Sequence, residues 1–521
     1  MLGAAAHVWA EPSTLPSRVI DVGSSGTEDV LSLRDTGGLE SDYIALSYCW
    51  GGKPPPQTVK SKLSAHQNGM PLSSLPATYA DAVYIARMLS IRFLWIDALC
   101  IIQDDDDDRN FELSRMDQTF RNATLVLIAA DSEDPFQGFL HPRRSEFLWS
   151  RPITIRDGHG YGQFVVDREQ PPFHDADPCR GHRIGGRAWT LQEHVLARRC
   201  LVFTTHECTW ECLAGCKCEC QGDDCNHQSQ LLRSEARPAA NNSERSPAAY
   251  DLWIEMVKAY SKRCLTNPSD KLLAIGAIAQ HVAGILQDQY VAGVWRNDIL
   301  REMVWWPTVL STERRPRQSL EYIAPSWSWA SWMGPIQYWR FNAPKPASGP
   351  DILDICCEVS SLNPYGSVHY AHVIMRGFAC RAELSIVDRI RHHRCQPVDV
   401  RERLFLLDGQ ELDFSEVFST PCERLVQVDM SRSGLQQIVL APPNDFAKDS
   451  EEEYQHVCKG QVTLFWISEE YCIVLVPSNR TPDAFERLGL VNNPRKPLRE
   501  LLKRRTSSGT DLIEQRVVKI V

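Results

Sequence analysis

The feature that most constrains this fold is a regular alternation of apolar runs and helical patterns in the first part of the chain. Three runs of bulky apolar residues predict buried strands: 43–48, 91–96 and 124–130. Between them, apolar residues at helical spacing predict a helix beginning near Thr78 and another from about 109 to 121. The Thr78 hydroxyl and the Asp81 carboxylate, three positions later, resemble a capping pair for the first helix. This alternation predicts an α/β unit with a mostly parallel sheet flanked by helices.

The composition is that of a globular protein with an acidic balance. The chain has 521 residues and a formal charge of −10, which disfavours a general nucleic-acid coat because phosphate binding relies on clustered Lys and Arg. No apolar run approaches the length of about eighteen residues that a membrane span requires, so no membrane partner is expected. Most of the eighteen Cys lie within apolar segments, which favours reduced, buried thiols in a cytoplasmic protein over a disulfide scaffold.

Three sequence blocks carry a more specific signal. They are YIALSYCWGG at 43–52, LWIDALCIIQDD at 94–105 with RMDQTFRNA at 115–123, and RAWTLQE at 187–193. In order and separation these blocks resemble the heterokaryon incompatibility (HET) domain, found in a fungal family linked to non-self recognition and regulated cell death. Later segments resemble the tail of full-length members: 260–279, 290–295 and 324–331. The resemblance also implies a likeness to Toll/interleukin-receptor domains, which would agree with the predicted α/β unit.

The resemblance and the composition together predict four regions. They are a HET domain at 1–220, a polar linker at 221–248, a helical segment with a Trp-rich strip at 249–340, and a mixed, β-rich C-terminal region at 341–521. The linker is expected because its residues are small and polar. The last region is expected to be β-rich because short apolar runs alternate there with turn residues.

Acidic residues near the second predicted strand are the first candidates for catalysis. Asp97 follows that strand, at the position where ligands bind in open α/β sheets, and could act as a base, orient a hydroxyl or bind a cation. Glu112 could converge with Asp97 and Gln103 at the same sheet edge, giving paired carboxylates with separated pKa values. Asp108 completes this candidate catalytic set. The structural alternatives are that Asp97 caps a loop or pairs with Arg187, and that Glu112 lies on a solvated helix face.

The third block combines residue types that bind anionic and planar groups. Arg187 and Trp189 could hold such a ligand by a bidentate contact and by stacking. The ligand-binding candidates are Tyr48, Trp50, Arg187, Trp189 and Gln192. Glu193, in the same block, is a further candidate catalytic carboxylate. The alternative is structural, with Trp189 in the core and Glu193 bonded to the backbone.

The sequence leaves the cofactor unknown, but two segments could hold metal ions. The run of five Asp at 104–108 could bind Mg²⁺, because hard cations prefer several oxygen ligands. The alternative is a solvated loop that complements a helix dipole. The zinc candidates are Cys212, Cys216, Cys218 and Cys220, since dense Cys in a reducing compartment suggests zinc before disulfides. Their C-x-C-x-C spacing is not a standard zinc pattern. Cys100, in an apolar stretch, is expected to be a buried structural thiol.

Three functions remain open on this basis. The first is a signalling or cell-death protein of the HET class, acting on an unidentified protein partner or small ligand, with Glu112 or Glu193 as catalytic candidates if a nucleotide cofactor is hydrolysed. The second is a biosynthetic enzyme similar to arginine-containing cyclodipeptide synthases, which take aminoacyl-tRNA and use an acidic motif. Asp107, Asp108 and Glu112 would supply that motif here. The third is a non-catalytic interaction module.

Overall fold

The structure is a computed structural model, and the chain divides into two compact units, residues 1–245 and 246–521, which are described separately. The residues described are 13–23, 29–52, 55–141, 150–157, 160–167, 179, 182–205, 207–212, 215–219, 245–307, 322–338, 349–360, 363–391, 396–406, 416–419, 436–440, 453–468, 471–492 and 513–521. Most of the predicted linker at 221–248 therefore lies outside the described residues.

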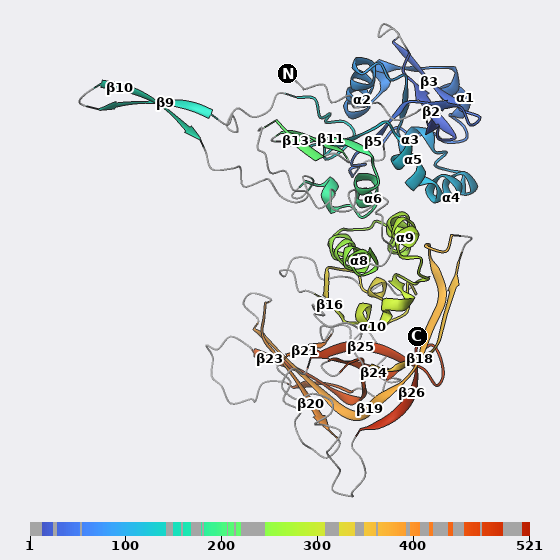
Figure 1. The fold of residues 1–521 in the computed structure, drawn as a ribbon, viewed down its shortest axis with the longest axis vertical. Coiled ribbons are helices and arrows are strands. Elements are labelled where there is room, and N and C mark those ends of the chain that lie inside the picture. Colours follow the sequence, from blue (N-terminus) through green and yellow to red (C-terminus); the bar gives the residue numbers. More distant parts are fainter. Residues whose placement is uncertain are drawn as a thin grey trace, which may run out of the picture. The chain divides into compact units, whose positions relative to one another are not determined.

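The first unit is built on a nine-stranded sheet with the spatial order β13-β12-β11-β8-β5-β7-β2-β3-β6 (Figure 1). The strands are β2 (Arg18–Asp21), β3 (Val30–Asp35), β5 (Tyr43–Ser47), β6 (Met70–Pro71), β7 (Phe93–Trp95), β8 (Leu125–Ala129), β11 (Arg199–Phe203), β12 (Cys208–Cys212) and β13 (Gly215–Cys218). Two smaller antiparallel pairs are β1 (Ser13–Thr14) with β4 (Glu40–Ser41), and β9 (Ser150–Asp157) with β10 (Gly160–Asp167).

The sheet is mixed, which corrects the expectation of a mostly parallel sheet. Only the four central strands, β7, β5, β8 and β11, pair in parallel. On both sides of this centre the pairings are antiparallel, from β7 through β2 and β3 to β6 and from β11 through β12 to β13. The strands β2 and β3, and likewise β11, β12 and β13, follow one another closely in the chain. Short connections of this kind can only join antiparallel neighbours.

The order of the central strands creates a switch point. The chain forms β5 first, then β7, β8 and β11, whereas their spatial order is β7-β5-β8-β11. The chain thus moves from β5 to one side, returns, and continues on the other side with β8. In doubly wound sheets of this type, ligands bind outside the carboxyl ends of the strands beside such a reversal. The residues after β5, β7 and β8 are therefore the first place to look for a site.

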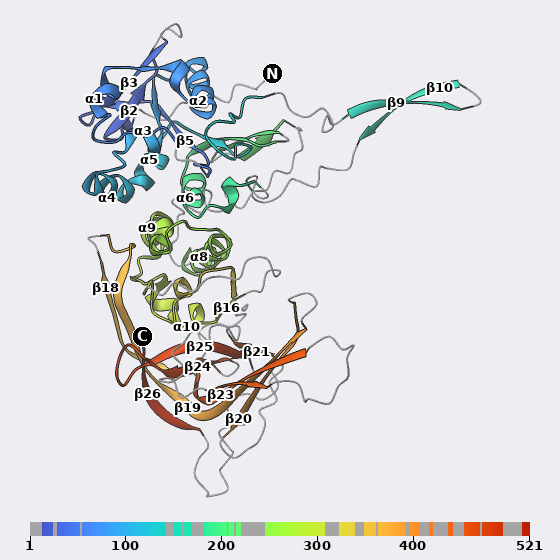
Figure 2. The ribbon, with the colours of Figure 1, turned by 180° about the vertical axis from the view of Figure 1, so that it is seen from behind.

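Helices cover both faces of the central strands. They are α1 (Leu63–Asn68), α2 (Ala77–Met88), α3 (Asp97–Cys100), α4 (Asp106–Ser114), α5 (Met116–Asn122) and α6 (Trp189–Val195). In both views α2 lies on one side of the strands and α6 on the other, with α5 packed beside α6 (Figures 1 and 2). From α5, Phe120 packs edge-on against Trp95 of β7, with ring centroids 5.6 Å apart.

Two expectations about these helices are wrong. The single helix at 109–121 is two helices, α4 and α5, separated at Arg115. Pro76, not Thr78, precedes α2 as its cap, and it makes no side-chain capping bond. Asp81 instead accepts hydrogen bonds from the backbone nitrogens of Phe139 and Leu140, at 2.7 and 3.0 Å. The Asp81 side chain therefore binds the loop after β8, whereas its local spacing predicts a helix cap.

The second unit begins with helices and a tryptophan-rich core. Its first elements are α8 (Arg245–Ser261), α9 (Leu273–Leu286), α10 (Ile299–Glu302) and two hairpins, β14 (Tyr290–Val291) with β15 (Val294–Trp295) and β16 (Trp305–Pro307) with β17 (Ile336–Tyr338). The largest fully buried side chains here are Trp253, Trp295, Trp305, Trp327 and Trp329. The Trp-rich strip at 324–331 thus belongs to the core.

The rest of the second unit is a barrel-like sheet, in agreement with the predicted β-rich C-terminal region. Its strands are β18 (Asp351–Val359), β19 (Val368–Arg391), β20 (Gln396–Leu406), β21 (Glu416–Ser419), β22 (Gln436–Leu440), β23 (Glu453–Trp466), β24 (Tyr471–Pro477), β25 (Phe485–Asn492) and β26 (Glu514–Ile520). The pairing runs from β19 through β26, β25 and β24 to β23, which pairs again with β19. Within the described residues, no helix is long and apolar enough to cross a membrane.

Candidate functional site

Asp97 lies at the carboxyl edge of the central strands, two residues after β7, as the first residue of α3. The indole Nε1 of Trp50 donates to its Oδ2 at 2.8 Å, and the backbone nitrogen of Ala98 donates to its Oδ1 at 2.6 Å. Burial raises the pKa of Asp97, while the Trp50 hydrogen bond and the positive charge of Arg187 oppose that rise. Asp97 is thus a carboxyl group with a perturbed pKa at the ligand-binding edge of the sheet.

Tyr48 links the three sequence blocks. Its hydroxyl lies 2.6 Å from the hydroxyl of Tyr79, with the two rings edge-on at 5.2 Å, and it also hydrogen-bonds Asp97. The backbone carbonyl of Tyr48 accepts a hydrogen bond from the Arg187 guanidinium at 2.7 Å. The first and third blocks therefore meet beside the carboxylate of the second.

Helix α6 places the other residues of the third block. Glu193 is buried and accepts a hydrogen bond from the hydroxyl of Ser47, the last residue of β5. This hydrogen bond comes from a side chain, and the structural alternative of a bond to backbone stays a prediction. Gln192 is also buried, and its Oε1 has no hydrogen-bond partner among the described residues. Trp189 packs half-buried against the core, as the structural alternative for it predicts.

We refer to six of these residues as the carboxyl-edge cluster: Ser47, Tyr48, Trp50, Asp97, Arg187 and Glu193. Five of the six were candidates from the sequence, and Ser47 was not. The cluster combines two carboxyl groups, one guanidinium and one half-buried indole. The carboxyl groups can accept hydrogen bonds from hydroxyls or take up a proton. The guanidinium can attract an anion, and the indole can contact a planar ring.

Gln103 contributes to this edge through the backbone. Its Nε2 donates to the carbonyls of Asp97 and Ile101, at 3.1 and 3.2 Å. It therefore stabilises the turn that follows α3. Among the described residues, its side chain thus bonds the backbone carbonyl of Asp97 and makes no bond to the Asp97 carboxylate.

Asp131 is a residue that the sequence did not single out. It follows β8, on the other side of the switch point, and accepts hydrogen bonds from the Thr205 hydroxyl and from Nε2 of His141, both at 2.5 Å. Burial by itself would raise the pKa of Asp131, but these bonds outweigh burial and lower it. The only sequence signal for it was its position directly after a predicted strand.

Glu112 and Asp108 belong to a second cluster, centred on Arg18 at the start of β2. The Nη2 atom of Arg18 lies 2.6 and 2.5 Å from the two carboxylate oxygens of Asp108 and 3.7 Å from Oε1 of Glu112. The Nε of Arg18 donates to the carbonyl of Cys100 at 2.7 Å. Burial raises the pKa of Glu112, and a hydrogen bond from Ser17 and the charge of Arg18 oppose that rise.

The two candidate carboxyl groups therefore have different hydrogen-bond partners, although both interact electrostatically with Cys100. The side chains that hydrogen-bond Asp97 are Trp50 and Tyr48 of the first sequence block, whereas Glu112 is hydrogen-bonded by Ser17, which precedes that block. Glu112 is 5% exposed, so it does not lie on a solvated helix face as the structural alternative expected. Its helix turns it toward the N-terminal segment of the chain.

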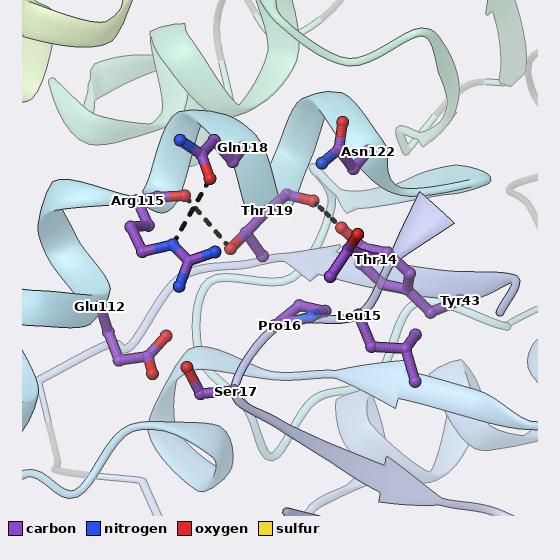
Figure 3. Close-up of a pocket in the computed structure, with 10 residues that line it drawn as sticks. All are labelled: Thr14, Leu15, Pro16, Ser17, Tyr43, Glu112, Arg115, Gln118, Thr119 and Asn122. Carbon is purple, nitrogen blue, oxygen red and sulfur yellow. Dashed lines mark hydrogen bonds between the residues drawn. The ribbon is translucent and has the colours of Figure 1, made fainter. Parts of the chain in front are cut away.

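A pocket of about 150 Å³ lies beside Glu112. Figure 3 shows its wall, which is formed by Thr14, Leu15, Pro16, Ser17, Tyr43, Glu112, Arg115, Gln118, Thr119 and Asn122. The Tyr43 hydroxyl donates to the carbonyl of Thr119 at 2.6 Å, which ties β5 to α5 at the base of this region. The pocket is therefore enclosed between α4, α5, the start of β5 and residues 14–17.

A family profile described as heterokaryon incompatibility protein (HET) matches residues 43–193. This range contains all three sequence blocks and the strands β5, β7 and β8. The chain carries a HET domain. A curated relative, heterokaryon incompatibility protein 6, OR allele, of Neurospora crassa, is 30% identical over 117 residues, which are 20% of this chain and 17% of the relative. The chain thus spans less than a fifth of that relative's length. No solved structure is significantly similar.

The HET domain range holds most of the candidate groups but not all of their partners. Asp97, Glu112 and Glu193 lie inside it. Arg18, which binds Asp108 and faces Glu112, precedes it, and β11, which completes the parallel centre, follows it. The sheet of the HET domain is therefore completed by strands that lie before and after the matched range.

The run of five Asp in the HET domain is engaged with protein groups. Asp105 caps α4 by accepting from the backbone nitrogens of Asp107 and Asp108, at 3.2 and 3.5 Å, and pairs with Lys60 at 3.1 Å. Asp108 also accepts from the backbone nitrogen of Ile102 at 2.8 Å. These contacts favour the capping and helix-dipole alternative for the run over a magnesium site.

The zinc candidates follow the HET domain on β12 and β13. Cys212 and Cys216 are thiols outside any disulfide, Cys218 is disulfide-bonded, and Cys220 lies outside the described residues. No group of three or more His, Cys, Asp or Glu within the described part of the chain could hold a metal ion. A disulfide at Cys218 differs from the expectation of reduced thiols, and zinc at the four cysteines stays a prediction. Burial raises the pKa of Cys100 to about 12, so its thiol is suited to a structural role.

Proposed function

We propose that this protein acts in heterokaryon incompatibility and triggers regulated cell death through a ligand bound at the carboxyl-edge cluster. The observation that carries the proposal is Asp97, a carboxyl group of raised pKa at the carboxyl end of β7. It is hydrogen-bonded to the first sequence block of the HET domain and lies close enough to Arg187 of the third block for the two charges to interact. Perturbed carboxyl groups at this edge of an open sheet are typical of ligand-binding and catalytic sites.

The chemistry of the cluster favours a nucleotide cofactor as the ligand. Arg187 can attract a phosphate, and Asp97 can accept hydrogen bonds from ribose hydroxyls. The half-buried rings of Trp50 and Trp189 offer flat apolar surface for a base or a nicotinamide ring. If the cofactor is hydrolysed, Asp97 and Glu193 are the carboxyl groups placed to act on the attacking water. Glu112, the other candidate, belongs to the Arg18 cluster.

The test is expression in a filamentous fungus of the wild type and of Asp97→Asn. The wild type is expected to arrest growth and to lower the cellular pools of nicotinamide or adenine nucleotides. Asp97→Asn keeps the size of the side chain but removes its charge, so both effects should be lost. Asp29→Asn is the matched control, because Asp29 is exposed, is not among the candidate site residues, and its substitution should leave both effects intact. Healthy growth with abundant, folded wild-type protein would contradict the proposal.

A cyclodipeptide synthase is retained as a second candidate because of one specific observation. Asp108 and Glu112, two members of its acidic motif, face the same guanidinium beside a pocket. Asp108 forms a close bidentate pair with Arg18, which leaves it less available for a substrate. The same cultures, compared by untargeted metabolite analysis with cultures expressing Glu112→Ala, would reveal a new cyclic dipeptide only if this candidate is correct. Its absence from wild-type cultures would exclude this function.

A further inference from the structure

We propose that the pocket between α4, α5 and residues 14–17 is a binding site for a free α-amino acid, with the ammonium group on Glu112 and the carboxylate on Arg115. The site uses none of the residues of the carboxyl-edge cluster. It is therefore independent of the cell-death function proposed above, whereas it shares Glu112 and this pocket with the cyclodipeptide synthase candidate. The inference depends on four properties of the pocket: an unpaired acceptor, the local charge, a placed cation and the available space.

The unpaired acceptor is Oε1 of Glu112. The Glu112 side chain is 5% exposed and belongs to the pocket wall. Its Oε1 has no hydrogen-bond partner among the described residues, and its contact with Arg18 is a long ion pair of 3.7 Å. The carboxyl group as a whole is fixed by a hydrogen bond from Ser17. Burying a polar oxygen without a donor is unfavourable, and native proteins usually supply one. A ligand with an N–H group would supply this donor once the Glu112 carboxyl group turns to present Oε1 to the pocket, because this oxygen is itself inaccessible to solvent.

The local charge favours a cationic donor. Asp108 and Glu112 bring two carboxyl groups to this region, and Arg18 is the cation that faces both. Arg18 lies within 2.6 Å of both oxygens of Asp108 but 3.7 Å from Oε1 of Glu112. Most of its charge is therefore neutralised by Asp108. An ammonium group on Glu112 would balance the second carboxylate and form a charge-assisted hydrogen bond.

Arg115 supplies a positive group at the mouth of the same pocket. It is exposed, and its guanidinium is held by a bond from Nε to Oε1 of Gln118 at 3.4 Å and by the ring of Phe111, 5.2 Å away. Figure 3 shows the guanidinium and the Glu112 carboxyl group directed toward the same space, opposite Pro16 and Ser17. A ligand between them thus meets a carboxyl group inside the pocket and a guanidinium at its opening.

The available space selects a small molecule. At about 150 Å³ the pocket could hold roughly five waters at about 30 Å³ each. Sites for larger ligands are typically about 300–1,000 Å³, so a nucleotide is excluded. An α-amino acid carries an ammonium and a carboxylate on adjacent atoms and has a matching size. An α-amino acid therefore matches all four properties of the pocket.

The experiment is a binding measurement on the purified full chain, by saturation-transfer NMR and then calorimetry, with each standard L-α-amino acid. At least one is expected to bind. Glu112→Gln and Arg115→Ala should each weaken that binding by about tenfold or more, because each loses a charged hydrogen-bonding group. Arg109→Ala, which removes an exposed cation of α4 that is not in the pocket wall, is the control and should bind as the wild type does.

Three outcomes would overturn the proposal. The first is that no amino acid binds to the folded wild type. The second is equal binding by the wild type, Glu112→Gln and Arg115→Ala, which would place the ligand elsewhere. The third is equally tight binding of the matching amine, which lacks the carboxylate, because Arg115 would then have no role. Since Arg115 is exposed, its variant remains informative even if Glu112→Gln folds poorly.

Discussion

At the scale of single residues, the buried ionisable groups have the clearest consequences. Lys271, in the second unit, is 3% exposed, its ammonium donates to the carbonyl of Trp332, and it lies 5.4 Å from the centre of the Trp329 ring. Burial lowers the pKa of Lys271 to about 7 from its ordinary 10.5. Between these two values the unfolded chain binds the proton and the folded chain releases it. Burial of this lysine is therefore most unfavourable at and below neutral pH and becomes less so as pH rises.

The second unit should therefore become more stable with rising pH because of Lys271. The contribution is at most about 1.4 kcal/mol per pH unit, and about 2 kcal/mol in total between pH 7 and 9. In Lys271→Met this contribution is absent. The difference in unfolding free energy between wild type and variant, measured in urea at several pH values, should shift by that amount in favour of the wild type as pH rises.

The matched control for this titration is Lys262→Met, at an exposed lysine that follows α8. Its difference from the wild type should be nearly constant across the same pH range. A constant difference for Lys271→Met as well would show that Lys271 keeps its proton in the folded protein.

At the scale of elements, the acidic run determines where α4 begins. Asp105 accepts two backbone N–H groups of the first turn and pairs with Lys60, and the remaining Asp residues lie at the positive end of the helix dipole. The helix is short, and it ends at Arg115 before α5 begins. Its stability should therefore depend strongly on this cap.

Asp105→Ala should lower the unfolding free energy of the first unit by about 1 kcal/mol, the typical loss when an Asp cap is replaced by Ala. Unfolding in denaturant measures this loss of free energy directly. Asp107→Ala removes a charge from the same turn without removing the cap and should have an effect of only a few tenths of a kcal/mol. Equal effects for the two variants would mean that charge, and not the capping bonds, stabilises α4.

Arg18 joins β2 to α3 and α4, and its loss should be more severe. Arg18→Met would leave the carboxyl groups of Asp108 and Glu112 without their shared cation, at a loss of about 3–5 kcal/mol, as when one partner of a buried ion pair is removed. The double variant Arg18→Met with Asp108→Asn should regain part of that stability. A double-mutant cycle in urea would quantify the coupling, and strictly additive effects would argue against the pair.

At the scale of the whole molecule, the chain forms two compact units, each with its own core. The first is an α/β unit around a mixed sheet, and the second combines a Trp-rich helical part with a barrel-like sheet. Units with separate cores commonly unfold as separate cooperative transitions.

Calorimetry of the full chain should therefore resolve two unfolding transitions. Arg18→Met should lower the temperature of only one of them, and Lys271→Met should shift only the other. The wild-type fragments 1–245 and 246–521, produced separately, should each reproduce one transition. A single transition shifted by both substitutions would show that the two units unfold together.

The sequence by itself was enough to identify the central strands, the helices between them and the HET domain. Each predicted strand is a short run in which nearly every side chain is apolar, as in YIALS of β5, and such runs are recognisable because parallel strands are buried on both faces. Tyr48 and Asp97 were both named as candidate site residues from the sequence, but the hydrogen bond between them was not predicted.

Only the tertiary structure decided which charged groups meet. Arg18 and Asp108 are 90 residues apart, and no local pattern pairs them, so the Arg18 cluster and its pocket were not foreseen. The different hydrogen-bond partners of Glu112 and Asp97, the antiparallel outer strands and the bonds from a later loop to Asp81 have the same cause. Local sequence patterns determine which side chains are buried, whereas the path of the whole chain determines which buried groups become neighbours.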